Sequence, residues 1–288
     1  EDGIRDVAVT GVQTCALPIL RKEDAALLTG NGRYADDLPV PPGTLQAYVL
    51  RSPHAHAIIK SINTAAALEL DGVAAVITGE EIANISDPFL VAVKEPIPQW
   101  SLAVERVRYV GEPVVLIVAS NRYIAEDAAE LVEIDYDVLD PVIDPLEAIK
   151  PGSPLVHEPV GTNELSRRDF KYGDPDAAFA SAHKIIKLDV EFPRHSYTPM
   201  ECFVVVAEYR RADQSYDVLA NFQGPFSAHP VMARSMRVPG SKLRLRTPAD
   251  SGGSFGIKLS VFPFIVLMGL AARIVGRPVK WVEDRLEQ

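Results

Sequence analysis

Residues 248–258 read Pro248-Ala249-Asp250-Ser251-Gly252-Gly253-Ser254-Phe255-Gly256-Ile257-Lys258, a glycine-dense turn that runs directly into a long apolar segment. Adjacent glycines adopt backbone torsions that other residues avoid, and they let a ligand approach the main chain. The helix predicted to follow from Lys258 directs unpaired N–H groups toward the same place. The turn is therefore predicted to cradle an anion or an oxygen-rich cofactor, with an ordinary loop before a core helix as the alternative.

Common nucleotide motifs do not fit this turn. A phosphate-binding P-loop places Ser or Thr directly after Gly-Lys, but here Ile257 separates Gly256 from Lys258. A dinucleotide fingerprint needs Gly-x-Gly-x-x-Gly, and the order Gly252, Gly253, Gly256 breaks it. The turn therefore supports neither simple ATP chemistry nor NAD chemistry.

Further motifs surround the turn. Residues 221–229 (NFQGPFSAH) lie upstream of it and residues 277–285 (RPVKWVEDR) lie downstream. With the turn, they resemble the molybdopterin-binding large subunit of the molybdenum hydroxylases, the family of xanthine dehydrogenase, aldehyde oxidase and carbon monoxide dehydrogenase. The other motifs of the resemblance, in the family's order, are 21–24 (RKED), 28–37 (LTGNGRYADD), 51–57 (RSPHAHA), 107–114 (VRYVGEPV), 125–132 (AEDAAELV) and 199–201 (PME).

The resemblance implies an α+β fold class. A hammerhead-type α/β domain is expected at residues 20–145, a proline-rich linker at 146–164, and the first part of the molybdopterin-binding α+β domain at 165–288. Residues 1–19 do not match the start of the family and read as a non-native leader or assembly scar. They also lack the features of a secretory signal.

Local patterns predict the main elements. Residues 113–119 form a continuous apolar run that is typical of a buried strand, and Asn121 is placed to cap a helix after it. Residues 133–136 alternate as a half-exposed strand does. Strands are also predicted at 184–192, 202–209, 216–221 and 243–247, with helices at 229–236 and after the glycine turn to about residue 275.

The resemblance assigns a cofactor site but no direct metal ligand. Gln223 matches the family's glutamine beside a metal-bound oxo group, where its amide N–H donates; a plain loop amide is the alternative. The residues implied to bind the cofactor are Gln223, Gly224, Gly252, Gly253, Phe255 and Gly256, with Gly252 and Gly253 as backbone donors and Phe255-Gly256 as the pair next to the metal.

The implied activity is hydroxylation or dehydrogenation of a small molecule at a molybdenum-molybdopterin centre, with the pterin in its cytosine dinucleotide form. Iron–sulfur clusters and FAD are expected on the partner subunits of a dimerised heterotrimeric enzyme in the cytoplasm. Purine-oxidising relatives carry a glutamate where Leu259 stands, and leucine forms no hydrogen bond. An aldehyde, an N-heteroaromatic compound or carbon monoxide is therefore expected as substrate rather than xanthine.

The family's catalytic base, a glutamate, is expected downstream of Gln288, so no catalytic residue is assigned within the chain. The chain is accordingly expected to be a truncated product that shows no turnover alone. Glu201 is expected to act in structure at least as much as in catalysis, and His195 to lie near the substrate entrance. The alternative is a non-catalytic α+β binding or assembly module that keeps only the cofactor cradle.

The composition of the chain reduces the classes of partner that it is expected to bind. The chain has 39 acidic and 29 basic residues and a net charge of −10, and its basic side chains are scattered, so nucleic acid is not expected to bind. The apolar run at 259–275 contains Pro263, Gly269 and Arg273, which favours a buried helix over a membrane span. His54 and His56 are predicted to share one face of a strand, but no third ligand accompanies them and no metal site is expected.

Overall fold

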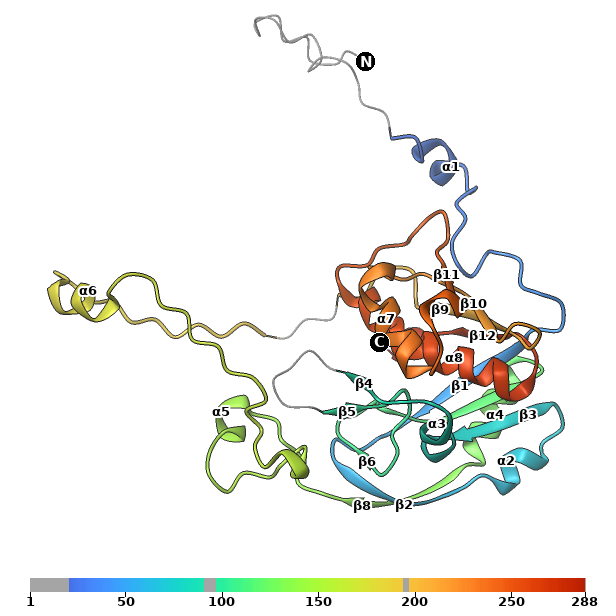
Figure 1. Cartoon of the computed structure of the whole chain (residues 1–288), viewed down its shortest axis with the longest axis horizontal. Coiled ribbons are helices and arrows are strands. Elements are labelled where there is room, and N and C mark those ends of the chain that lie inside the picture. The colour runs from blue at the N-terminus through green and yellow to red at the C-terminus, as the bar shows by residue number, and fades with distance from the viewer. Residues whose placement is uncertain (1–20, 91–96, 194–196, 288) are drawn as a thin grey trace, which may run out of the picture.

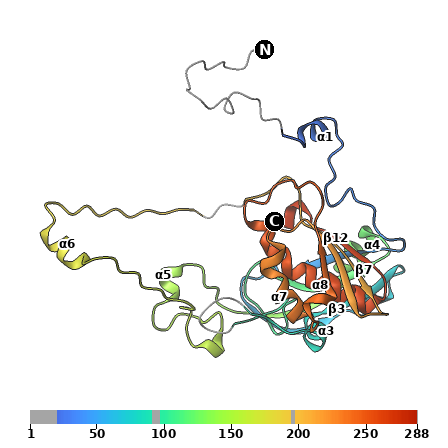
Figure 2. The same ribbon diagram turned by 45° about the horizontal axis from the view of Figure 1, so that its top comes forward.

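The computed structural model describes residues 21–90, 97–193 and 197–287. The predicted leader at 1–19 and His195 lie outside the described residues. Most of the described chain forms one body, and the segment that carries α6 (Pro175–Ser181) extends away from it (Figures 1 and 2). The chain mixes helices and strands, as the α+β expectation requires.

The largest sheet has seven strands in the order β11-β10-β9-β12-β1-β7-β3. Strand β1 runs parallel to β12, with Leu45 opposite Val279, and β10 runs parallel to β11; the other neighbours are antiparallel. The sheet therefore joins strands from both predicted domains. The strands are β1 (Leu45–Arg51), β3 (Val73–Thr78), β7 (Pro113–Ala119), β9 (Val204–Arg210), β10 (Ser215–Ala220), β11 (Leu243–Arg246) and β12 (Val279–Val282).

Strand β7 has the bounds predicted from its apolar run, and all seven of its residues are buried. Its side chains alternate between two hydrophobic clusters. Leu116 and Val118 join the cluster around the long C-terminal helix, and Val115 and Ile117 join a second cluster under α4 (Arg122–Glu130). Both faces of β7 are thus covered, which explains why its sequence does not alternate between apolar and polar residues.

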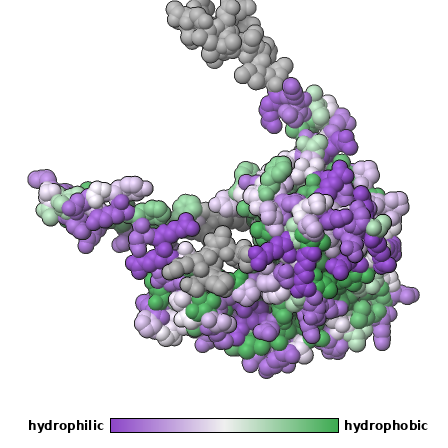
Figure 3. Space-filling view, viewed as in Figure 1, coloured by the Kyte–Doolittle hydropathy of each residue, from purple (hydrophilic) through white to green (hydrophobic). Residues whose placement is uncertain are grey.

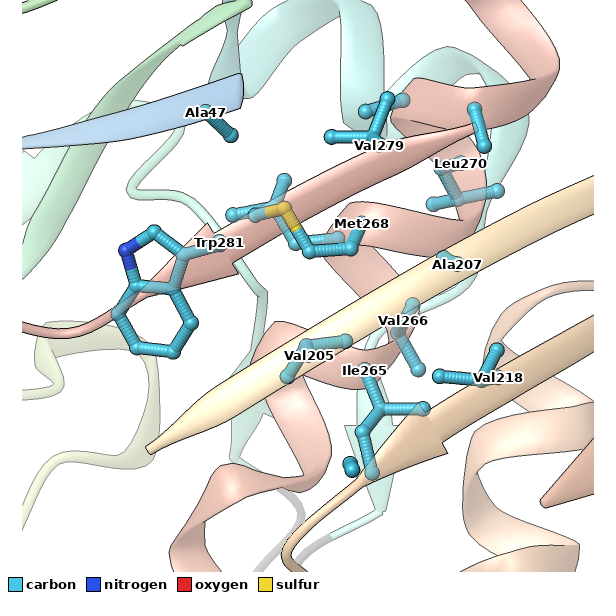
Figure 4. Packing of buried hydrophobic residues seen from close by; sticks show 14 of the residues in the cluster. Ala47, Val205, Ala207, Val218, Ile265, Val266, Met268, Leu270, Val279 and Trp281 are labelled. Carbon is cyan, nitrogen blue, oxygen red and sulfur yellow. The ribbon is translucent and has the colours of Figure 1, made fainter. Parts of the chain in front are cut away.

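The long apolar run forms a 3₁₀ turn, η4 (Ile257–Val261), that continues into helix α8 (Phe262–Val275). Residues 265–272 of α8 are all buried. Side chains from β9, β10 and β12 gather on this helix (Figure 4). Gly269 allows the close approach, because a β-carbon there would lie 2.5 Å from Met236 Cε. Among the described residues, Ile257–Val275 is long and apolar enough to cross a membrane, and here it is the core helix of the sheet.

Helix α7 (Pro225–Ser235) packs against α8, and α4 packs on β1 and β7. The predicted cap of α4 is confirmed, because Asn121 Oδ1 accepts the N–H of Ile124 at 3.0 Å. A three-stranded sheet has the order β6-β2-β8, and β4 pairs with β5. The remaining bounds are α1 (Asp24–Leu28), α2 (Ala65–Glu69), α3 (Gly79–Ile85), β2 (Ala57–Asn63), β4 (Phe89–Leu90), β5 (Pro98–Gln99), β6 (Arg106–Val107), β8 (Glu133–Val138), α5 (Pro145–Ala148), η2 (Glu158–Val160), η3 (Gly240–Lys242) and η5 (Arg285–Glu287).

The strand predicted at 184–192 is wrong. These residues form no strand, and Ile186, Leu188 and Val190 are 80%, 82% and 78% exposed. The segment projects from the body with hydrophobic residues on its surface (Figure 3). Its alternating sequence has a strand's period, but a strand also needs a neighbour for its backbone hydrogen bonds, and no described strand pairs with it.

Candidate cofactor-binding site

The glycine turn at 248–258 is anchored by an ion pair between Lys258 and Glu201. The side chain of Lys258 is only 1% exposed and that of Glu201 only 10%, and the Lys258 ammonium contacts Glu201 Oε2. The pair crosses 57 residues of sequence. It therefore fastens the C-terminal end of the turn to the segment that precedes β9.

Glu201 gathers three parts of the chain. Its Oε2 accepts the backbone N–H of Gly252 at 2.9 Å, and its Oε1 accepts the N–H of Ala35 at 3.2 Å. Burial by itself raises the pKa of Glu201, but the hydrogen bonds from Lys258, Gly252 and Ala35 outweigh it, so the net pKa is lowered. Glu201 is thus ionised at neutral pH and serves as a structural anchor, a role expected for it at least as much as catalysis.

The glycines of the turn serve different purposes. Gly252 has no room for a side chain, because a β-carbon would lie 2.4 Å from Glu201 Cβ. Gly253 and Gly256 have φ angles of 98° and 95°, in the left-handed region that glycine tolerates. A β-carbon on Gly256 would meet no atom within 4 Å. Phe255 lies between them with φ of 51° and is 67% exposed, so the turn presents bare backbone and an aromatic ring to the surface.

Backbone donors are available at this turn. The N–H of Gly252 is used by Glu201, so it does not point outward. Within the described part of the chain, no acceptor takes the N–H groups of Gly253, Phe255 or Gly256. The turn therefore offers backbone N–H donors to an acceptor outside the protein. These donors belong to Gly253, Phe255 and Gly256, and not to Gly252.

Gln223 lies against the same turn. Its backbone N–H donates to the carbonyl oxygen of Lys258 at 3.3 Å, and its side-chain Oε1 accepts the hydroxyl of Ser254. With Oε1 engaged, the amide N–H₂ group of this exposed side chain remains to donate. Gly224 follows with φ of 66° and caps α7, and Leu259 lies beside it. The structure thus brings Gln223, Gly224 and the glycine turn together.

The turn also contains Gly-Gly-Ser-Phe-Gly, which has the Gly-x-Ser-x-Gly form of a hydrolase nucleophile elbow. The geometry excludes that role for Ser254, because its hydroxyl donates to Gln223. Among the described histidines, none hydrogen-bonds to Ser254; His229, on the neighbouring helix, contacts the carbonyl oxygen of Leu243. A nucleophilic serine needs such a base.

His54 and His56 do not lie where the sequence predicts. His54 and His56 lie in the loop between β1 and β2, not on one face of a strand. His54 makes an edge contact with Tyr136 at 4.9 Å between ring centroids, and His56 Nδ1 bonds to the carbonyl oxygen of Asp140 at 3.0 Å. No group of three His, Cys, Asp or Glu side chains that could hold a metal occurs among the residues that the structure describes.

The sequence did not reveal the anchor of the site. Lys258 follows the turn in the sequence, and no local pattern connects it or Ala35 to Glu201. The signal in the sequence was a single lysine within the apolar run that begins at Ile257. A lysine that is buried there needs a carboxylate partner, and Glu201 is the carboxylate of the Pro-Met-Glu motif.

The exposed glycine turn, with backbone donors that no described acceptor takes and the Gln223 amide beside it, is chemically suited to a ligand rich in oxygen acceptors. Two family models match the chain. Residues 156–288 match the molybdopterin cofactor-binding domain, and residues 29–140 match the a/b hammerhead domain of aldehyde oxidase and xanthine dehydrogenase. The chain belongs to the molybdenum hydroxylase family, in which it corresponds to part of the molybdopterin-binding large subunit.

Individual relatives show the same likeness. The chain is 34% identical to the carbon monoxide dehydrogenase large chain of Hydrogenophaga pseudoflava, over 98% of this chain and 36% of that one. It is 40% identical to subunit gamma of the 6-hydroxypseudooxynicotine dehydrogenase complex of Paenarthrobacter nicotinovorans, over 93% and 34%. Quinoline 2-oxidoreductase from Pseudomonas putida 86 superposes with a TM-score of 0.87 at 36% identity, over 93% and 34%. The chain thus spans about a third of the length of these relatives.

Proposed function

We propose that this chain forms one wall of the molybdopterin site of a molybdenum hydroxylase large subunit. The observation that carries the proposal is the open backbone of the glycine turn, which is held on a rigid support by the Lys258–Glu201 pair. The substrate class is a small molecule such as an aldehyde, an N-heteroaromatic compound or carbon monoxide. The names of relatives that act on carbon monoxide and quinoline support this range.

The residues present fit the group. A molybdopterin offers phosphate and pterin acceptors, and the donors that no described acceptor takes are the N–H groups of Gly253, Phe255 and Gly256 and the amide N–H₂ of Gln223. The open space over Gly256 lets a ligand reach the main chain. Gly252 contributes by closing the turn onto Glu201, so the donor role first predicted for it passes to its neighbours.

The chain's own part in the chemistry is to bind and orient. When bound, the cofactor would supply the molybdenum redox chemistry, and its pterin, not a side chain, would hold the metal. Gln223, fixed by Ser254 on one side and Lys258 on the other, would direct its amide N–H toward an oxygen acceptor. Leu259 beside Gly224 would line the pocket without a hydrogen bond, which favours apolar substrates over purines.

The 288 residues alone are proposed to show no turnover. Phe255 is 67% exposed and Phe226 is 90% exposed, so this face lacks the cover that a closed active site needs. The same proposal includes iron–sulfur and FAD partner subunits in a dimerised heterotrimer. It also includes a cytoplasmic location. The name of the Paenarthrobacter relative describes a subunit of a complex, which supports it.

The test is cofactor content. The chain is purified from a host that makes molybdopterin; molybdenum is measured by mass spectrometry, and pterin by fluorescence after oxidative release. We expect close to one of each per chain, with cytidine monophosphate released on hydrolysis, and a severalfold loss in Gln223→Ala. The matched control is Gln214→Ala, which removes another exposed amide.

The same preparation distinguishes the proposed function from the alternative one. A chain that stays free of metal and pterin in that host, yet captures an iron–sulfur or FAD subunit in a pull-down, would identify a non-catalytic assembly module. Oxidation of any substrate by the cofactor-loaded chain would contradict the predicted lack of turnover.

A further inference from the structure

A cavity of about 520 Å³ lies away from the glycine turn. Its walls come from the segment at 97–112, which includes β5 and β6, and from residues 156 and 157 of the linker. None of its lining residues belongs to the turn at 248–258 or to Gln223. Its volume is in the range of sites that enclose small organic molecules.

The linker is held onto this cavity by two arginines. Arg106 forms an ion pair with Glu158 at 3.1 Å, and Arg108 Nε donates to the carbonyl oxygen of Val156 at 3.2 Å. These contacts fix Val156 and His157 as one wall. The cavity is thus a built feature of the fold and not a gap beside a loose linker.

Part of the cavity lining is apolar. Trp100, Ala103, Val104 and Val156 line it. Trp100 and Val104 are only partly buried, so each leaves apolar surface to cover. An aromatic ring is the group that best covers a tryptophan face.

The polar part presents a cation and an anion together. Arg108 and Glu112 both line the cavity, and Glu112 Oε2 accepts the backbone N–H of Arg108 at 2.5 Å. In the described part of the chain, no carboxylate forms an ion pair with the Arg108 guanidinium, whose Nη1 donates to the carbonyl oxygen of Arg106 at 3.4 Å. A donor at Arg108 and an acceptor at Glu112 are therefore both offered to a ligand.

The charged side chains that line the cavity are of both signs, with Glu105 and Glu112 acidic and Arg108 basic. A charged ligand would therefore meet a like charge as well as an opposite one, whereas a neutral polar ligand meets no like charge. Burial and the nearby arginines and His56 lower the pKa of His157, so this imidazole is neutral at neutral pH. Burial raises the pKa of Glu112, against the hydrogen bonds that it accepts from the backbone.

We propose that this cavity binds a small, neutral, planar aromatic carboxamide. The ring lies against Trp100 and Val156, the amide carbonyl accepts from Arg108, and the amide N–H₂ donates to Glu112. An amide matches this pair because it carries one acceptor and two donors in one plane. The site is independent of the cofactor proposal, since it shares no residue with the glycine turn.

The test uses tryptophan fluorescence of the 288-residue chain. The chain has two tryptophans, and Trp281 is buried in the core while Trp100 lines the cavity. Benzamide, benzoate and benzamidine are titrated as matched neutral, anionic and cationic probes. We expect a saturable change with benzamide, roughly tenfold weaker binding of the two charged probes, and loss of the signal in Trp100→Phe.

Variants locate the site. Arg108→Gln and Glu112→Leu are expected to weaken benzamide binding roughly tenfold, while Arg167→Gln, in an exposed ion pair, leaves it unchanged. Far-UV circular dichroism checks that each variant is folded. If a variant is unfolded, the comparison of the three probes on the unaltered chain still tests the proposal.

Three results would overturn the proposal. One is the absence of saturable benzamide binding in both fluorescence and ligand-observed NMR. The second is benzoate or benzamidine binding as tightly as benzamide. The third is unchanged benzamide affinity in folded Arg108→Gln and Glu112→Leu.

Discussion

The buried ammonium of Lys258 contacts the carboxylate of Glu201 and thereby fastens the glycine turn to the segment before β9. The same carboxylate accepts N–H groups from Gly252 and Ala35, so one side chain joins three parts of the chain. Removing either partner leaves the other charge buried without compensation, which costs more than the pair itself contributes.

Lys258→Met is therefore expected to lower the free energy of unfolding by about 3–5 kcal/mol. The measurement is urea unfolding followed by circular dichroism. Lys150→Met is the control, because Lys150 and Glu147 are 59% and 63% exposed and such pairs contribute about 1 kcal/mol or less. Equal losses in the two variants would show that the buried pair is not an anchor.

Acid is expected to weaken the same anchor. The pKa of Glu201 in the fold is lowered from an ordinary value of 4.5. Its contribution is therefore fully present above pH 4.5 and is lost as pH falls through the lower folded value. Melting temperatures across this range should fall more steeply in the unaltered chain than in Glu201→Gln. Glu191→Gln, at an exposed position, should follow the unaltered chain.

The glycines of the turn are expected to differ in their tolerance of alanine. Gly252→Ala forces a β-carbon against Glu201 and should cost about 1–3 kcal/mol through overpacking. Gly256→Ala has open space, so its cost of about 1 kcal/mol comes from the left-handed backbone alone. Chemical unfolding measures both. A larger loss at position 256 than at 252 would contradict the contact that the structure shows.

The seven-stranded sheet is expected to unfold as one unit. Strands β1, β3 and β7 belong to the predicted hammerhead region, yet β1 pairs with β12, and Leu45, Val49 and Leu116 pack in the α8 cluster. A protein of residues 20–145 alone would expose these side chains, so we expect it to lack a steep urea transition. A transition as steep as that of the whole chain, with strong amide protection in β7, would show that the two regions fold independently.

The sequence predicted the elements whose signals are local. The bounds of β7, the Asn121 cap and the apolar run that forms α8 all depend on neighbouring residues, and the structure confirms them. The strand at 184–192 failed because its alternation describes one strand only, and pairing needs a second. The His54 and His56 pair failed because the strand ends at Arg51, before the motif.

The sequence by itself determined the family, the α+β class and local elements such as β7, because these follow from ordered motifs and local backbone preferences. Only the tertiary structure decided that Glu201 joins Ala35, Gly252 and Lys258, and that β1 pairs with β12 across 234 positions between Leu45 and Val279. These partners are distant in sequence, and no local pattern specifies which buried charge or open strand edge meets which.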